Sequence, residues 1–440
     1  MRKWEVIVSR DLKLNLRGQT VFRFIHAADI HLDSALRGLL RYEGAPVDEI
    51  RSATRRAFDN LIDLAIEESV DFVLLAGDLY DGDWKDYNTG LYFIERMGRL
   101  HEAGIQVLMV AGNHDAASQL TKHLRLPDNV KMFGTRTPEC LILDNLPVAI
   151  YGQGFANRAV TEDLSQGYPQ GDPQLFTIGL LHTCLDGKPG HEPYAPCTID
   201  GLRSKGYHYW ALGHVHKREE ISRDPWIVFP GNIQGRHIRE TGPKGCTLVT
   251  VQHGEVTTVE HRDLDVLRWT RCEVDLGDCQ TVDDGYDQVR KVLEQTIDEA
   301  EGRPIAARLV LQGTSSTHSR LHAELEHWTQ EFRALASTLG GAGIWLENVS
   351  LHTQPAVSVE NLLTHDDALS GLLRGIRDME LDDSALAELA QDVSGFRQKL
   401  PAEILSGEDS FDPSDPQQLH VILEDIKELL VNRLLTPGKD

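Results

Sequence analysis

The sequence predicts an α/β fold with a largely parallel core sheet, or two sheets packed face to face, covered by helices. Five short runs rich in Val, Ile, Leu and Phe are bounded by Gly or Asp, which is typical of buried strands. Helical patterns separate the first three runs, and such alternation of strands and helices is typical of α/β domains. The runs span residues 21–28, 71–76, 105–111, 176–181 and 209–212, and the helical patterns span 53–68 and 91–103.

A short motif of potential metal ligands directly follows each of these runs. Because ligands gather beyond the carboxyl ends of the strands in such folds, we expect the motifs to lie close together. They supply the carboxylates, imidazoles and amide that two adjacent divalent metals need, which indicates two-metal hydrolysis of a phosphoester. The motifs are Asp29-Ile30-His31, Gly77-Asp78, Gly112-Asn113-His114-Asp115, His182 and Gly213-His214-Val215-His216.

Each ligand has an expected place in the two-metal centre. Asp78 is expected to bridge the metals, since paired cations lie about 3.5–4 Å apart. A set without thiolates disfavours a closed structural zinc site and suits manganese, iron or zinc. The remaining ligands divide into one site with Asp29, His31 and His216 and another site with Asn113, His182 and His214.

His114 follows a ligand directly and is expected to point across the open face of the centre. There it could protonate the leaving oxygen or stabilise the charge that develops on the phosphoryl group. Asp115 is expected to orient His114, as carboxylates often orient functional histidines. Asp81 and Asp83, which follow Asp78 closely, are expected to belong to a turn or to support the ligands.

The segments that carry these motifs resemble the calcineurin-like metallophosphoesterase superfamily. Within it, the chain is similar to SbcD-type DNA repair nucleases and more closely to a bacterial YhaO-like branch. The resemblance implies a sandwich of two sheets flanked by helices, two manganese ions held by the seven ligands, and a catalytic role for His114. Familiar archaeal and eukaryotic members carry a histidine where this chain has Asp81. The segments are FIHAADIHLDS, FVLLAGDLYD, VLMVAGNHD, LLHT, YWALGHVH and FPGNIQGRHIRE.

The resemblance favours a manganese-dependent DNA nuclease that hydrolyses phosphodiester bonds, expected to be an exonuclease in DNA break repair. One alternative is a phosphatase or small-molecule phosphodiesterase of the same superfamily. Another is a scaffold whose metal site only organises an assembly. The complete ligand set argues against the scaffold, because a catalytically dead relative usually lacks one or two ligands.

Four parts make up the expected domain organisation. An N-terminal extension, residues 1–20, precedes a catalytic domain at 21–265. Strand and helix patterns alternate as β-α-β-α-β over residues 266–355 and predict a small α+β module. The resemblance implies that this module caps the active site and contacts DNA. Residues 356–440, with 18 acidic and 7 basic side chains, are expected to form an acidic helical region that binds a partner.

The last helical segment carries an apolar stripe that must bury against another surface. Leu419, Ile422, Ile426 and Leu429 recur at heptad-like spacing. The stripe either packs on its own domain or docks onto a coiled coil. The resemblance favours the coiled-coil base of an SMC-like ATPase, of the SbcC type or YhaN-like, and also implies a homodimer. The chain has no Gly-x4-Gly-Lys-Ser/Thr loop, so any ATP dependence would come from a second polypeptide.

The net charge of −24, from 44 basic and 68 acidic residues, is unusual for a protein that binds DNA. We therefore expect a partner to supply part of the DNA affinity. Among the few basic residues near the motifs, Arg236 and Arg239 are expected to contact substrate phosphate, together with Asn232.

Cysteine usage and hydropathy bear on the compartment. The six cysteines lack Cys-x-x-Cys spacing, which favours a reducing cytosol and hence a cytoplasmic location. No apolar stretch reaches the ~18–20 residues needed to span a bilayer, so no membrane association is expected.

Overall fold

The computed structural model describes residues 21–34, 47–81, 88–116, 125–185, 194–340, 343–356, 367–379, 383–393, 412 and 415–435. The chain divides into two compact units. One comprises Met1–Leu36 and Pro46–Trp269, and the other comprises Arg37–Ala45 and Thr270–Asp440. The predicted N-terminal extension lies outside the described residues. No helix in this described part of the chain is long and apolar enough to cross a bilayer.

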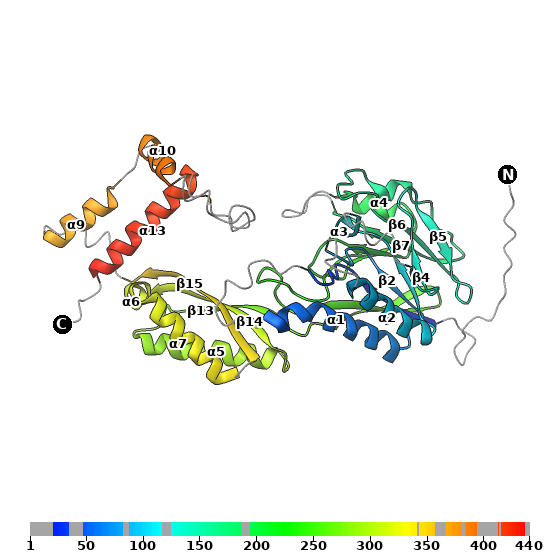
Figure 1. Cartoon of the computed structure of the whole chain (residues 1–440), viewed down its shortest axis with the longest axis horizontal. Helices are drawn as coiled ribbons and strands as arrows, with labels where there is room; N and C mark the ends of the chain where they lie inside the picture. Colours follow the sequence, from blue (N-terminus) through cyan, green and yellow to red (C-terminus); the bar gives the residue numbers. More distant parts are fainter. Residues whose placement is uncertain are drawn as a thin grey trace. The chain divides into compact units, whose positions relative to one another are not determined.

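Two six-stranded sheets form the first unit (Figure 1). The first sheet consists, in spatial order, of β12 (Glu255–Asp263), β11 (Gly245–Gln252), β1 (Val21–Ala27), β2 (Phe72–Leu75), β3 (Gln106–Met109) and β4 (Val130–Met132). The second consists of β5 (Glu139–Ile142), β6 (Val148–Gln153), β7 (Phe176–His182), β8 (Tyr209–Gly213), β10 (Trp226–Phe229) and β9 (Glu219–Arg223). Strands β1 to β4 are parallel, whereas β11 runs antiparallel to β1. Strands β6, β7, β8 and β10 are likewise parallel.

The two sheets pack face to face around a shared apolar core. Phe22 and Phe24 of β1 lie in this core with Ile178 and Leu180 of β7, which belongs to the other sheet. Because side chains alternate along a strand, Ile25 of β1 lies in a second core on the opposite face. Both faces of the central strands are therefore buried, which explains why their sequences are continuously apolar.

Helices cover the outer faces of the two sheets. They are α1 (Val47–Glu67) and α2 (Asn88–Glu102) on the first sheet, and α4 (Ile199–Arg203) with the short 3-10 helix η3 (Leu164–Gly167) on the second. Phe58 of α1 and Phe93 of α2 stack with ring centroids 6.0 Å apart in the same core as Ile25. On the second sheet, Trp210 of β8 packs with Leu202 of α4 and donates its indole N–H to the Leu202 carbonyl at 3.2 Å.

The structure decides between the two predicted arrangements in favour of two sheets packed face to face. Each of the five predicted strands is present, with both ends within two residues of the predicted bounds. Helix α1 begins at Val47, earlier than the predicted 53. It begins earlier because Ile50, Ala53 and Ala57 form one buried face that continues the helical period toward the N-terminus.

The second unit contains a three-stranded sheet in the order β13-β14-β15 (Figure 1). Its elements are β13 (Arg268–Asp275), α5 (Val282–Glu299), β14 (Ile305–Ser315), α6 (His318–Ala323), α7 (Leu325–Gly340) and β15 (Ile344–Pro355). This order agrees with the predicted β-α-β-α-β pattern, except that its second helix is divided into α6 and α7. The division falls at Glu324, whose φ and ψ are −119° and 30°. Helix α6 places Nδ1 of His318 2.9 Å from Oγ1 of Thr353 in β15.

Three further helices follow in the second unit: α9 (Ala368–Arg377), α10 (Asp383–Asp392) and α13 (Pro416–Leu435). Leu419 of α13 packs with Leu386 and Ala390 of α10, and Ile422 lies against the same small core. Helix α13 also lies against α6 and α9. Part of the predicted apolar stripe is therefore covered by the chain's own helices.

Gly179 in β7 lies opposite Trp210 in β8 and leaves room for the indole ring. A Cβ atom at position 179 would lie 2.2 Å from two carbons of that ring. We expect Gly179→Ala to lower the free energy of unfolding by about 1–3 kcal/mol, because extra atoms in a packed core force their neighbours to move. Calorimetry of the purified protein would measure this as a lower melting temperature of the first unit.

Gly98→Ala is the matched control. Gly98 lies in α2, and a Cβ atom there would meet nothing within 4 Å. This control should raise the free energy of unfolding by about 0.5–1 kcal/mol, since alanine loses less chain entropy than glycine in a helix. An unchanged melting temperature in Gly179→Ala would contradict the packing of β7 against β8.

Candidate metal centre

Tight turns at the ends of β1 and β2 position the first ligands. Asp29, His31 and Asp78 have positive φ angles of 52°, 47° and 52°, in the left-handed region that Asp and His adopt more readily than most residues. The amide of Asp29 donates to the carbonyl of Gly77 at 3.1 Å, and the amide of His31 donates to the carbonyl of Asp78 at 3.0 Å. These two hydrogen bonds hold the ligands of neighbouring strands together.

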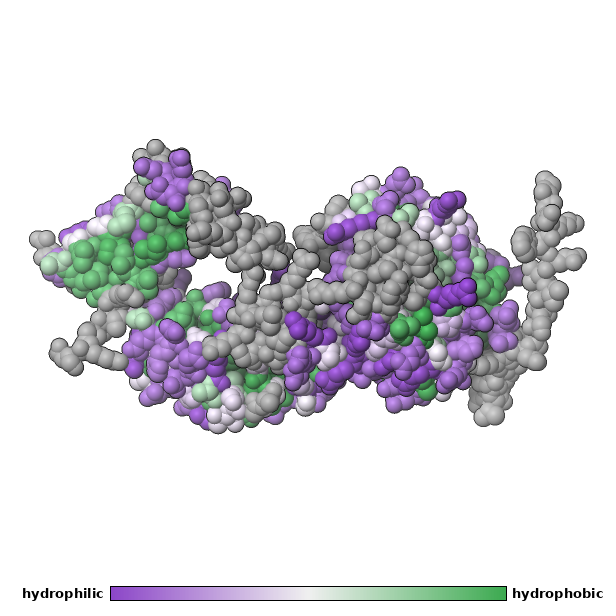
Figure 2. All heavy atoms as spheres, in the orientation of Figure 1, coloured by the Kyte–Doolittle hydropathy of each residue, from purple (hydrophilic) through white to green (hydrophobic). Residues whose placement is uncertain are grey.

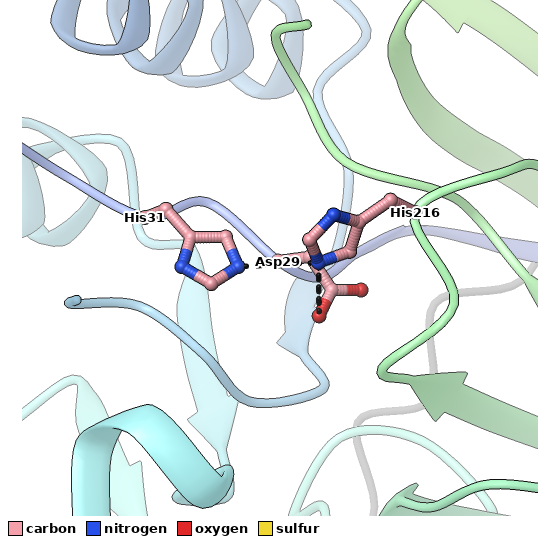
Figure 3. A group of neighbouring side chains, drawn as sticks. All are labelled: Asp29, His31 and His216. Carbon is pink, nitrogen blue, oxygen red and sulfur yellow. Dashed lines mark hydrogen bonds and ion pairs between the residues drawn. The ribbon is translucent and has the colours of Figure 1, made fainter. Parts of the chain in front are cut away.

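Asp29, His31 and His216 converge on one point (Figure 3). Nε2 of His31 lies 3.3 Å from Nε2 of His216, and Nε2 of His216 lies 3.8 Å from Oδ1 of Asp29. Asp29 and His31 are almost completely buried, whereas 27% of the His216 side chain is exposed. One ligand atom from each residue lies within 4.8 Å of the others, a spacing that suits a single cation.

A second group forms around Asp78. Nε2 of His182 lies 3.5 Å from Oδ2 of Asp78 and 2.9 Å from Oδ1 of Asn113. Oδ2 of Asp78 is also 3.9 Å from Nε2 of His31, which belongs to the first group. Asp78 therefore reaches toward both groups, and this position suits the predicted bridge between two metals. Asp29 likewise belongs to both groups.

His214 completes the predicted ligand set. Its amide donates to both carboxylate oxygens of Asp29, at 3.1 and 3.0 Å. Its ring centroid lies 5.2 Å from that of His182, with the two rings nearly perpendicular. The structure thus brings together all seven residues that the sequence predicted as ligands.

The protonation of this centre suits divalent cations. Burial raises the pKa of Asp29 well above its usual range and that of Asp78 to about 6. Burial lowers the pKa of His182 to about 3 and that of His31 well below its usual value. The imidazoles of His31 and His182 are therefore neutral, which is the form that coordinates metals. Two buried carboxylates beside neutral imidazoles fit a pair of divalent ions, whose charge would offset the cost of burying the carboxylates.

His114 lies beside the ligands, with 32% of its side chain exposed. Its ring centroid is 5.0 Å from that of His31. Nδ1 of His114 lies 2.6 Å from Oδ1 of Asp81. Although burial acts in the opposite direction, this hydrogen bond raises the pKa of His114. Asp81, expected only as a turn or supporting residue, is thus the carboxylate that contacts His114.

The predicted pairing of Asp115 with His114 is wrong. The Asp115 carboxylate instead accepts hydrogen bonds from the backbone amides of Tyr80, Gly112 and Leu79, at 2.8, 3.0 and 3.2 Å. These bonds join the loop after β2 to the loop after β3. Asp115 therefore fixes the backbone around the centre, and His114 points elsewhere because adjacent residues of a helical turn face different directions.

The three predicted substrate contacts have different surroundings. Asn232 has no exposed surface, and its amide donates to the Gln234 carbonyl at 2.8 Å and to Glu240 at 2.9 Å, so it stabilises its own loop. This corrects its predicted role at the substrate. Arg236 is only 14% exposed and contacts Glu240. Arg239 is exposed, and its contact with substrate stays a prediction.

Glu240 belongs to the centre, and the sequence motifs gave no sign of it. Its Oε1 accepts a hydrogen bond from Nδ1 of His216 at 2.7 Å, although the two residues are 24 positions apart. Metal-binding histidines commonly donate their second ring N–H to a carboxylate in this way. Glu240 lies in the segment that carries the family resemblance, but nothing in its local spacing marks it as a partner of His216.

A sandwich of two sheets with carboxylate, imidazole and amide ligands at the strand ends defines a metal-dependent phosphoesterase. Comparisons with known proteins agree. Residues 22–218 match the family model of calcineurin-like phosphoesterases, and residues 269–354 match the model described as metallophosphoesterase YhaO, middle domain.

Two relatives cover most of the chain. The uncharacterized metallophosphoesterase YhaO of Bacillus subtilis is 38% identical over 307 residues, which cover 67% of this chain and 73% of that protein. The DNA double-strand break repair protein Mre11 of Sulfurisphaera tokodaii is 27% identical over 320 residues, which cover 69% of this chain and 77% of that protein. The chain therefore belongs to the YhaO-like branch of the metallophosphoesterases, which is related to Mre11-type nucleases.

Metal should stabilise the protein more strongly at pH 7.5 than at pH 5. The folded pKa of Asp78, about 6, lies above its ordinary value of 3.8. The protonated Asp78 carboxyl therefore adds to the free energy of unfolding. This contribution is fully present below the ordinary pKa and is lost as the pH rises through about 6. A bound cation removes this loss, so manganese(II) should raise the melting temperature more at the higher pH. Thermal unfolding at both pH values, with and without metal, measures this difference.

Asp78→Asn provides the control, because an amide cannot supply the charge that bridges two cations. This variant should lose most of the melting-temperature increase caused by manganese at pH 7.5. An equal increase at both pH values in the wild-type protein would contradict the assignment of Asp78 as a buried ligand.

Proposed function

We propose that the protein is a two-metal, manganese-dependent DNA nuclease that hydrolyses phosphodiester bonds as an exonuclease in DNA break repair. The main support is the convergence of seven ligands from separate strand ends, with a partly exposed histidine beside them. The relationship to an Mre11 protein whose name describes repair of DNA double-strand breaks favours DNA as the substrate.

The residues of this chain can be given separate tasks in such a reaction. Two divalent ions bound by the seven ligands would supply Lewis acidity and a nucleophile at neutral pH. His114, held by Asp81, faces the exposed side of the centre and can donate a proton to the leaving oxygen. Asp115 keeps the loops after β2 and β3 in register, so that Asp78 and Asn113 stay in position.

A phosphatase or small-molecule phosphodiesterase is the alternative with the same chemistry. Comparing p-nitrophenyl phosphate with bis(p-nitrophenyl) phosphate distinguishes the two classes, because only a diesterase prefers the second compound. A strong preference for the monoester would overturn the nuclease proposal.

His114→Ala tests the proposed proton donor. The variant should keep both metals, since His114 is not among the ligands, but should lose about 10²–10⁴-fold in turnover. Asp78→Ala should abolish metal binding and cleavage together. The measurement is degradation of linear single- and double-stranded DNA with manganese(II), with metal content determined on the same samples.

The control for this experiment is His101→Ala. His101 is exposed near the end of α2, outside the metal centre, so cleavage should equal that of the wild type. Wild-type turnover in His114→Ala would refute the role of His114. Absence of DNA cleavage by the wild type, combined with hydrolysis of the small diester, would refute DNA as the direct substrate of the isolated chain.

An SMC-like coiled-coil ATPase, of the SbcC type or YhaN-like, is the proposed partner, and a homodimer is the proposed form of the chain. An apolar surface on the C-terminal helices supports a docking site. It comprises Leu369 and Leu372 of α9 with Val421, Ile426, Leu429 and Leu430 of α13. Figure 2 shows a hydrophobic area over α9 and α13 on the visible face. Leu419 and Leu423 of α13, in contrast, are buried within the unit. The N-terminal part of the apolar stripe on α13 thus packs within the unit, whereas Ile426, Leu429 and Leu430, nearer its C-terminal end, are exposed.

The double variant Ile426→Glu/Leu430→Glu should lose binding to the coiled-coil ATPase, because two charges would have to be buried in the interface. Co-elution of the two purified proteins in size-exclusion chromatography measures this. Ile142→Glu is the control: Ile142 is 51% exposed on β5, in the first unit. Unchanged co-elution of the double variant would place the docking site elsewhere.

A cytoplasmic location is proposed on the state of the cysteines. None of the six cysteines forms a disulfide, and five of them are buried. Buried cysteines outside disulfides are common in reducing compartments.

A further inference from the structure

Arg236 lies between the two carboxylates that contact the histidines at the edge of the metal centre. Nη2 of Arg236 is 3.1 Å from Oε1 of Glu240, and Nη1 is 3.9 Å from Oδ2 of Asp81. Glu240 in turn contacts His216, and Asp81 contacts His114. A continuous series of polar contacts therefore leads from a metal ligand to the proposed proton donor.

The Glu240 end of this series determines how His216 can bind metal. Because Oε1 of Glu240 accepts the proton of Nδ1 at 2.7 Å, the lone pair of His216 is on Nε2, which faces His31 and Asp29. Glu240 is held from other sides by the amide of Arg236 at 2.8 Å and by Asn232 at 2.9 Å. The carboxylate thus has little freedom to turn away from His216.

The Asp81 end is built in the same way. Oδ2 of Asp81 accepts a hydrogen bond from Ser34 at 2.7 Å, and Nη1 of Arg236 lies 3.5 Å from the same hydroxyl oxygen. Oδ1 of Asp81 remains for His114 at 2.6 Å. A guanidinium is suited to this place because its planar fork can face two carboxylates at once, whereas an ammonium is a single point charge.

These contacts disagree with the expectation that Arg236 binds substrate phosphate. Only 14% of its side chain is exposed, and Nη2 also lies 3.3 Å from Nδ1 of His216. Turning toward a phosphate would remove the cation from Glu240, which is 6% exposed, and leave a buried carboxylate without its charge partner.

We infer that Arg236, Glu240 and Asp81 form a bracket of charged side chains that fixes His216 for metal binding and His114 beside it. Arg236 is thus a positioning residue for the two-metal centre. The inference rests on the function proposed above, in so far as that function requires bound metal.

Manganese(II) titration of the metal-free protein, followed by calorimetry without any nucleic acid, tests the bracket. Arg236→Gln and Glu240→Gln should each weaken manganese affinity about 10–100-fold, the usual effect of removing a group that supports a metal-binding histidine. The double variant Arg236→Gln/Glu240→Gln should bind manganese no more weakly than the single variant with the lower affinity, because both substitutions disrupt the same contact. Wild-type affinity in Arg236→Gln, or single effects that multiply in the double variant, would overturn the inference.

Arg268→Gln is the matched control for loss of a buried arginine. Arg268 is 9% exposed and pairs with Asp265 at 3.0 Å, outside the metal centre. Its removal should lower the melting temperature without changing manganese affinity. If Arg236→Gln does not fold, Arg236→Lys keeps the charge and removes only the fork. Folded Arg236→Lys with wild-type manganese affinity would overturn the bracket.

The rival role is tested by DNA binding without metal at several salt concentrations. Arg236→Gln should leave the slope of log affinity against log salt unchanged. A slope smaller in magnitude by about 0.9, the effect of one lost phosphate contact, would show that Arg236 binds DNA and would overturn the inference. Failure of the wild type to cleave DNA would refute the proposed nuclease but not the manganese result, so the two claims fail separately.

Discussion

The burial of two carboxylates in one small volume is the constraint on which the first unit depends. Asp29 and Asp78 are nearly inaccessible to water, and each raises the energy of the other's charged form. Like charges in such surroundings persist only with cations or protons beside them. The backbone amide of His214 offsets part of the cost by donating to Asp29, but an amide carries only a partial charge. Neutral side chains alone therefore cannot offset the free-energy cost of burying these two negative charges.

Further charged side chains surround the two buried carboxylates in layers. Carboxylates and neutral imidazoles lie innermost, Glu240 and Asp81 support the histidines behind them, and Arg236 balances both supports. An acidic protein thus places a guanidinium inside the first unit, with only 14% of the Arg236 side chain exposed. In the proposed nuclease, DNA affinity would then have to come from other surfaces or from the proposed partner.

The sequence predicted which residues come together, because parallel strands end at the same edge of a sheet and the residues directly after them lie close to one another. The sequence did not predict where a side chain points when that direction depends on tertiary contacts. Asp115 follows His114 in one helical turn, so the two cannot face each other, and Asp81 occupies that place instead. Arg236 and Asn232 looked like surface residues of a polar loop, because nothing local showed that Glu240 folds back onto His216.

The left-handed backbone at Asp29, His31 and Asp78 has a consequence for how these positions can vary. Asp, Asn, His and Gly adopt that conformation more readily than most residues, whereas it is energetically costly for branched or bulky residues. Glutamate has the same coordinating group as aspartate, yet it lacks the short polar side chain that stabilises this turn. The left-handed backbone and the need for a metal ligand therefore favour nearly the same few amino acids at these three positions. During evolution glutamate is therefore expected to be excluded from these positions more strongly than its coordinating carboxylate alone would suggest.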